Sequence, residues 1–76
     1  MHEIKITIGN TNPLVLCEIF NKYKSEFDLH SQRAAIDGKS FLGIHTLNPK
    51  EPILLKIIEK DNELENILKD LESFIV

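Results

Sequence analysis

The chain has 76 residues, of which 42% are hydrophobic and 28% charged, and this length fits one soluble domain with no room for a second. Nine Lys and Arg against twelve Asp and Glu give a formal charge of −3, and no basic stripe with interleaved aromatics is visible, so we expect no nucleic-acid partner. Cys17 is the only cysteine, which excludes an internal disulfide, and no Cys or His residues stand at the spacing of zinc ligands. We therefore expect a reduced, cytoplasmic protein with no metal, no cofactor and no segment inserted in a membrane.

The N-terminal part of the chain predicts a strand followed by a helix. Isoleucine stands at every second position of residues 4–8, a period-two pattern that is typical of a strand with one buried face. Turn-forming residues follow, and Pro13 is suited to the first turn of a helix. Apolar residues from Leu16 to Tyr23 then recur at helical spacing, which predicts an amphipathic helix over residues 13–24.

The middle of the chain predicts a hairpin and a short helix. Alternation over residues 27–30 indicates a second strand, and a tight turn leads from it into a third strand at residues 33–36. Ser40 then stands where its side-chain oxygen can cap a helix over residues 41–47. Pro49 and Pro52 follow the predicted helix and end it.

The C-terminal part predicts a central strand and a final helix. Residues 53–58 are mostly apolar and rich in β-branched side chains, as expected for a strand near the middle of a sheet. An apolar stripe predicts a helix over residues 62–74, and Asn62 with Glu65 has the spacing of a capping box. The element order β-α-β-β-α-β-α predicts an α+β fold with helices on one face of an antiparallel sheet.

Residues 39–47 read KSFLGIHTL. This segment is similar to the KS-[IL]-[LMF]-G-[VIL]-x-[ST]-L segment that opens the short middle helix of the HPr family of small phosphocarriers. Chain length and element order agree with that family as well, and the likeness is concentrated in residues 28–57. The resemblance implies a single HPr-like domain over residues 1–76, an open-faced β-sandwich with a four-stranded antiparallel sheet and its helices packed on one face.

Members of this family carry a phosphoryl group on the histidine of a Gly-x-His-x-Arg-Pro motif between the first strand and the first helix. A neutral imidazole nitrogen attacks phosphorus there, while the arginine and helix N–H groups hold the phosphate oxygens. The matching stretch of this chain is Asn10, Thr11, Asn12 and Pro13, without histidine or arginine. Because amide and pyrrolidine side chains cannot form a phosphoramidate, we expect no phosphate transfer at this place and no enzymatic activity.

The resemblance implies two further sites on the middle helix. Ser40 matches the serine that an ATP-dependent kinase phosphorylates in many members, although the same serine is a good helix cap whether or not a kinase acts on it. Phe41, Leu42 and His45 match positions through which members bind partners, and the alternative is that Phe41 or Leu42 tucks against the sheet edge. The implied function is a regulatory protein-interaction module related to the phosphoenolpyruvate-dependent sugar phosphotransferase system. Its expected partners are components of that system or HPr kinase.

Two other functions stay open from the sequence. An active phosphocarrier would need another acceptor, His45 or His30, and neither has a carboxylate or Cys partner at catalytic spacing. A ferredoxin-like small-molecule-binding domain begins with the same element order, and the order of strands in the sheet distinguishes the two folds. Cys17, beside the apolar stripe of its helix, is interpreted as a small core residue.

Overall fold

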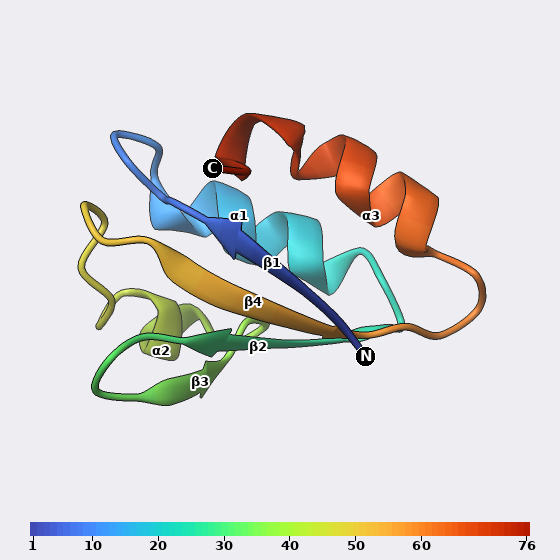
Figure 1. The fold of residues 1–76 in the computed structure, drawn as a ribbon, viewed down its shortest axis with the longest axis horizontal. Helices are drawn as coiled ribbons and strands as arrows, with labels where there is room; N and C mark the ends of the chain where they lie inside the picture. Colours follow the sequence, from blue (N-terminus) through green and yellow to red (C-terminus); the bar gives the residue numbers. More distant parts are fainter.

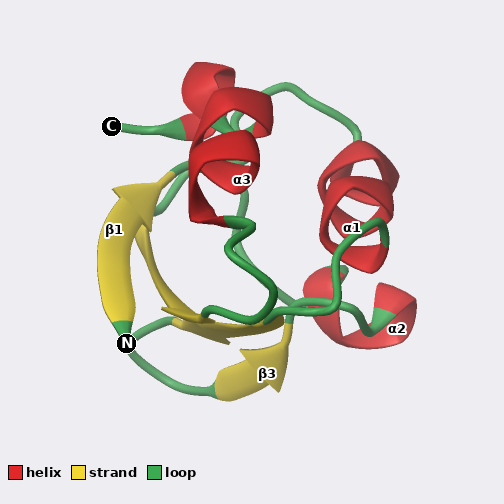
Figure 2. Cartoon of the chain, turned by 90° about the vertical axis from the view of Figure 1, so that its right-hand side faces the viewer, coloured by secondary structure: helices red, strands yellow, loops and turns green.

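The computed structural model describes residues 1–76. Its four strands, β1 (His2–Ile6), β2 (Glu26–His30), β3 (Ala35–Asp37) and β4 (Ile53–Ile58), form one antiparallel sheet in the order β1-β4-β2-β3. The helices are α1 (Pro13–Asn21), α2 (Phe41–Ile44) and α3 (Leu64–Asp70), and a 3₁₀ turn, η1 (Glu72–Phe74), follows α3. Figure 1 shows α1 and α3 running along the sheet, and Figure 2 shows the sheet curving around them with α2 at the side of β3. The predicted α+β fold is confirmed.

The hydrophobic core fills the space between the sheet and the helices. One aliphatic residue of each strand lies in a single row across the sheet: Ile4, Leu55, Leu29 and Ile36. Above it the buried ring of Phe20 from α1 stacks on that of Phe27 from β2, with centroids 4.4 Å apart. Together with apolar residues of the other helices and loops they form one continuous core, which a domain of this size needs in order to fold.

Strand order decides between the two folds that the element order allowed. In the ferredoxin-like topology the first and third strands form the central pair. Here β4 and β2 are central, while β1 and β3 are the edges. The ferredoxin-like alternative is therefore wrong. The prediction of a central strand at residues 53–58 is confirmed.

The free edge of β1 is partly covered by the C-terminal residues. The strand lies nearer the N-terminus than its alternating pattern predicted, because the backbone after it turns to other partners. The N–H of Thr7 donates to the carbonyl of Phe74 at 2.9 Å, and the N–H of Val76 donates to that of Lys5 at 3.1 Å. These bonds satisfy backbone groups that an open sheet edge would leave unpaired.

The helices α1 and α2 are shorter than predicted. The side-chain amide of Asn21 donates to the carbonyl of Cys17 at 2.9 Å, and the next N–H, of Lys22, bonds only three residues back along the chain. This tightening of the last turn ends α1 at Asn21. The N–H of Thr46 also bonds three residues back, so α2 is a single turn.

The start of α3 differs most from the prediction. Asn62 has a left-handed backbone with φ of 54°, whereas a residue that caps a helix has an extended one. The residue before the helix is Glu63, which makes no capping bond, and the N–H of Leu64 donates instead to the carboxylate of Glu59 at 3.0 Å. The predicted capping box of Asn62 and Glu65 is therefore wrong.

None of the helices has both the length and the apolar character needed to span a bilayer. The structure also brings together no group of His, Cys, Asp and Glu side chains that would hold a metal ion.

Candidate functional site

The helix α2 begins at Ser40, as predicted. The hydroxyl oxygen of Ser40 accepts the N–H of Gly43 at 3.1 Å, and the backbone of Ser40 is extended. This is the geometry of an N-cap, which satisfies one of the donors that the first turn of a helix leaves free. The local role of Ser40 is therefore to start the helix.

The first two residues of α2 expose large apolar side chains. Phe41 is 46% exposed and Leu42 is 81% exposed, whereas Ile44 and Leu47 are buried in the core. Leu42 therefore does not tuck against the sheet edge, and Phe41 is left about half exposed. Neither exposed side chain is needed to fill the core, so both are available at the surface for contacts with another molecule.

His45 lies against Phe41 at the end of the same turn. Their rings meet edge to face with centroids 4.3 Å apart, and Nδ1 of His45 is 2.8 Å from the carbonyl oxygen of Phe41. A carbonyl only accepts, so neutral His45 donates from Nδ1 and keeps the lone pair on Nε2. The three predicted docking residues thus lie together on one helical turn.

The residue before this turn binds α2 to α1. The carbonyl of Lys39 accepts the side-chain amide of Asn21 at 3.2 Å and the thiol of Cys17 at 3.5 Å. Leu14 lies one turn before Cys17 on the same side of α1 and is 37% exposed, and its neighbour Val15 is 44% exposed. The first turns of two helices that pack side by side therefore both expose apolar residues.

The turn before α1 holds the residues that match the phosphohistidine motif. The side chain of Asn12 caps α1 by accepting the N–H of Leu14 at 3.0 Å, and Pro13 occupies the first position of the helix. Asn10 and Thr11 are exposed in the turn. The side-chain oxygen of Asn12 is thus engaged with the helix backbone, and the segment offers a phosphoryl group no imidazole nitrogen.

The other two histidines and the cysteine lie outside α2. His2 lies 3.5 Å from the carboxylate of Glu59 at one end of the sheet, and His30 is half-buried on β2. Cys17 is buried in the core, and burial raises the pKa of its thiol even though the hydrogen bond from Asn21 lowers it. The prediction that Cys17 is a core residue is confirmed.

A polar cluster that the sequence analysis missed holds the start of β2 to the start of α3. The carboxylate of Glu63 accepts the hydroxyl of Ser25 at 2.8 Å and the N–H groups of Ser25 and Lys24 at 2.9 and 3.0 Å. Desolvation raises the pKa of the Glu63 carboxyl, but these hydrogen bonds outweigh it and lower the pKa below its ordinary value. No local pattern signals a contact between residues so far apart in the chain.

A second cluster joins the end of α1 to the end of α3. The carboxylate of Asp70 accepts hydrogen bonds from Lys22, at 2.7 Å, and from the hydroxyl of Tyr23. Burial and this hydrogen bond raise the pKa of Tyr23 to about 12. The bonds from Lys22 and Tyr23 lower the pKa of the Asp70 carboxyl. Both clusters fix α3 over the sheet and lie outside α2.

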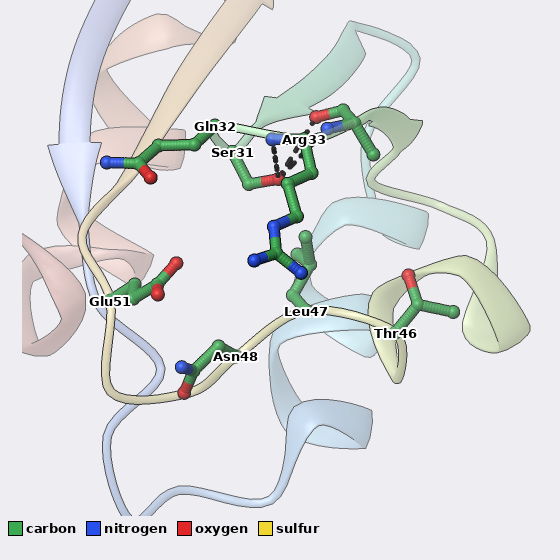
Figure 3. Close-up of a pocket in the computed structure, with 8 residues that line it drawn as sticks. Ser31, Gln32, Arg33, Thr46, Leu47, Asn48 and Glu51 are labelled. Carbon is green, nitrogen blue, oxygen red and sulfur yellow. Dashed lines mark hydrogen bonds between the residues drawn. The ribbon is translucent and has the colours of Figure 1, made fainter.

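A polar hollow, shown in Figure 3, lies between the turn that follows β2 and the loop that follows α2, and no sequence pattern predicted it. It has a volume of about 300 Å³ and includes Arg33, Asn48 and Glu51 in its lining. A wider, more open hollow of about 440 Å³ adjoins it and shares Ser31 and Gln32. The sequence signalled only a turn here, because the lining comes from two distant segments.

Comparison with known proteins shows a likeness in structure. No protein-family model and no curated protein matches this chain. A crystal structure of HPr-C-His from Thermoanaerobacter tengcongensis is similar to it with a TM-score of 0.76, covering 99% of this chain and 91% of that one at 24% identity. At this identity the likeness shows the fold, so the predicted HPr-like open-faced β-sandwich is confirmed.

Proposed function

We propose that this chain is an HPr-like regulatory protein that binds a protein partner through α2. The observation that carries the proposal is the exposure of Phe41 and Leu42 on the first turn of that helix. Large apolar and aromatic side chains that are free at the surface are typical anchors of protein interfaces. The HPr-like fold supports a cytoplasmic partner from the sugar phosphotransferase system, or HPr kinase, and a role that is not enzymatic.

The side chains in the turn before α1 support a regulatory binding role rather than a phosphocarrier role. A phosphocarrier needs an imidazole nitrogen to attack phosphorus and a cation to hold the phosphate oxygens. Asn10 and Asn12 have amide side chains, which are not nucleophilic, and no arginine stands beside them. We therefore propose that the protein takes no phosphoryl group at this turn.

Ser40 is the proposed site of regulation. Its side chain is only partly buried, and it stands directly before Phe41 and Leu42. A phosphate on this hydroxyl would place about two negative charges at the edge of the apolar anchor and at the favourable end of the helix dipole. Phosphorylation would thus change the partner that α2 accepts without unfolding the helix.

One experiment tests both parts of the proposal. The full chain is incubated with HPr kinase and ATP, and separately with enzyme I and phosphoenolpyruvate, each beside an authentic HPr. Intact mass is expected to rise by one phosphoryl group with the kinase, to stay unchanged in Ser40→Ala, and to stay unchanged with enzyme I. An acid-labile phosphohistidine, or no modification by a kinase that modifies the authentic HPr, contradicts the corresponding part.

Docking is tested by the affinity for the kinase. Leu42→Ser is expected to weaken binding by roughly tenfold or more, as for a residue at the centre of an interface. Val76→Ser is the matched control, because Val76 is 72% exposed and lies at the C-terminus. Equal affinities of the two variants would contradict docking through α2.

A second candidate function is phosphate transfer through His45. The hydrogen bond of Nδ1 to the carbonyl of Phe41 favours it, since it leaves Nε2 as the nucleophilic nitrogen on an exposed side chain. Phosphorus NMR after incubation with enzyme I and phosphoenolpyruvate would then show a phosphohistidine that His45→Ala abolishes. Labelling that persists in His45→Ala would leave His30 as the acceptor to test.

A further inference from the structure

The polar hollow of Figure 3 holds two opposite charges that the fold leaves unpaired. Arg33 reaches into it from the turn after β2, and Glu51 faces the guanidinium from the loop before β4. Neither side chain forms an ion pair with the other or with any other residue. All ion pairs of the chain involve other residues, so this pair of charges is not used to hold the fold.

The backbone around the hollow is satisfied without these charges. The hydroxyl of Ser31 accepts the N–H groups of Arg33 and Ala34 at 3.3 and 3.2 Å, which closes the turn. Oδ1 of Asn48 accepts the N–H of Lys50 at 3.0 Å and closes the loop. This bond fixes the orientation of the Asn48 amide, so its NH₂ group stays free. The hollow is therefore lined by a hydrogen-bonded turn and loop, and the Arg33, Asn48 and Glu51 side chains have donor or acceptor groups left free there.

The free groups define the chemistry of a ligand. The donors are the guanidinium of Arg33 and the amide NH₂ of Asn48, while the carboxylate of Glu51 is an acceptor of opposite charge. A guanidinium suits a carboxylate, which it binds through two parallel hydrogen bonds. A carboxylate such as that of Glu51 suits an ammonium group. The lining carries one charge of each sign, so a simple anion would meet repulsion from Glu51 and a simple cation would meet repulsion from Arg33.

We propose that this hollow binds a small zwitterion of the amino-acid class. The α-carboxylate pairs with Arg33 and the NH₂ of Asn48, the ammonium group pairs with Glu51, and the ligand side chain lies on the apolar surface of Leu47 and Ala34. A volume of about 300 Å³ is at the lower end of the range for small-molecule sites, which fits a ligand of this size. This proposal does not depend on docking through α2.

The test is a titration of the full chain, labelled with ¹⁵N, followed by its amide resonances. The probes are the standard amino acids with uncharged side chains, and acetate, methylammonium and inorganic phosphate serve as probes with a single charge sign. We expect at least one amino acid to give saturable shifts confined to residues 31–34 and 46–51. Exposed charge contacts contribute little each, so a dissociation constant on the order of 1 mM is expected.

Variants separate recognition by the hollow from general charge effects. Arg33→Gln and Glu51→Gln are each expected to weaken binding by about fivefold or more, while Lys50→Gln, which removes a charge from the same loop outside the lining, leaves it unchanged. All three positions are exposed, so the variants keep the fold. Three results would each overturn the proposal. The first is that no amino acid gives saturable shifts, and the second is that acetate, methylammonium or phosphate alone saturates to the same degree. The third is an equal loss of affinity in Lys50→Gln.

Discussion

Two glycines on either side of Ser40 allow one substitution to be compared in two environments. Gly38 is buried against Phe20 and Phe27, and a methyl group added there would lie 2.9 Å from Cδ2 of Phe20 and 3.0 Å from Cβ of Phe27. Its backbone is outside the left-handed region, so alanine is disfavoured there by crowding alone. Both aromatic side chains are fully buried and stacked, and they have no free space to move into.

Crowding of this kind in a packed core costs about 1–3 kcal/mol. For a domain of this length, each kcal/mol lowers the melting temperature by about 4–8 °C. Gly38→Ala is therefore expected to melt roughly 10 °C below the wild type. The magnitude follows from two contacts that are shorter than any ordinary carbon contact, which is about 3.5–4.0 Å.

Gly43→Ala is the matched control. The added methyl would meet Oγ of Ser40 at 3.2 Å and Cβ of Ile36 at 3.5 Å, and both contacts are longer than the two at Gly38. Alanine within a helix is also favoured over glycine by about 0.5–1 kcal/mol. We expect the stability of Gly43→Ala to lie within about 1 kcal/mol of the wild type.

Urea unfolding followed by circular dichroism measures both variants, with slopes compared to confirm a two-state transition. The expected result is a lower midpoint for Gly38→Ala and little change for Gly43→Ala. A Gly38→Ala protein as stable as the wild type, or a larger loss in Gly43→Ala, would refute the account of how Gly38 is packed.

Three further predictions concern the polar clusters. Ser25→Ala removes a fully buried hydroxyl that accepts the N–H of Lys60 at 2.9 Å. We expect the free energy of unfolding, measured by urea titration, to fall by about 1–3 kcal/mol. The exposed control Ser73→Ala is expected to lose less than about 0.5 kcal/mol. The pKa values of the Glu63 and Asp70 carboxyls are lowered on folding, so the unfolded chain binds more protons, and urea midpoints are expected to fall as pH drops from about 5 to 3; midpoints that stay constant would contradict this. The pKa of Tyr23, the sole tyrosine, is raised to about 12, and its ultraviolet titration is expected to show that midpoint and to move toward 10 in Asp70→Asn, whereas a wild-type midpoint near 10 would contradict the burial of its hydroxyl. The stability linked to Tyr23 is present below pH 10 and is lost as pH rises through 12.

The spacing of apolar residues predicted the bounds of an element correctly where burial against the core decides which residues belong to it. The strand at residues 53–58 has the predicted bounds because it is central, with its alternate residues facing the core. The start of α3 could not be predicted, because the carboxylate of Glu63 bonds to Ser25 and Lys24 in place of its own helix. A partner so far along the chain leaves no local signal, whereas a capping box is recognised from local spacing alone.

The same distinction applies to the candidate sites. The sequence predicted that Ser40 caps a helix, because a capping interaction joins residues that are close along the chain. The structure confirms this interaction. It left open whether Phe41 and Leu42 face the core, because a single turn is too short for a helical period to tell its buried side from its exposed side. The hollow between Arg33 and Glu51 arises only when the turn and the loop come together in the fold.

The orientation of α2 depends on contacts made by Lys39. A helix of four residues has no stability of its own, so its direction must come from its neighbours. The carbonyl of Lys39 accepts the amide of Asn21 at 3.2 Å, and its ammonium group donates to the carbonyl of Tyr23 at 2.6 Å. Backbone and side chain of the residue before Ser40 are thus both bound to the end of α1. A surface on one helical turn can in this way be fixed before a partner arrives, which lowers the entropy that binding would otherwise cost.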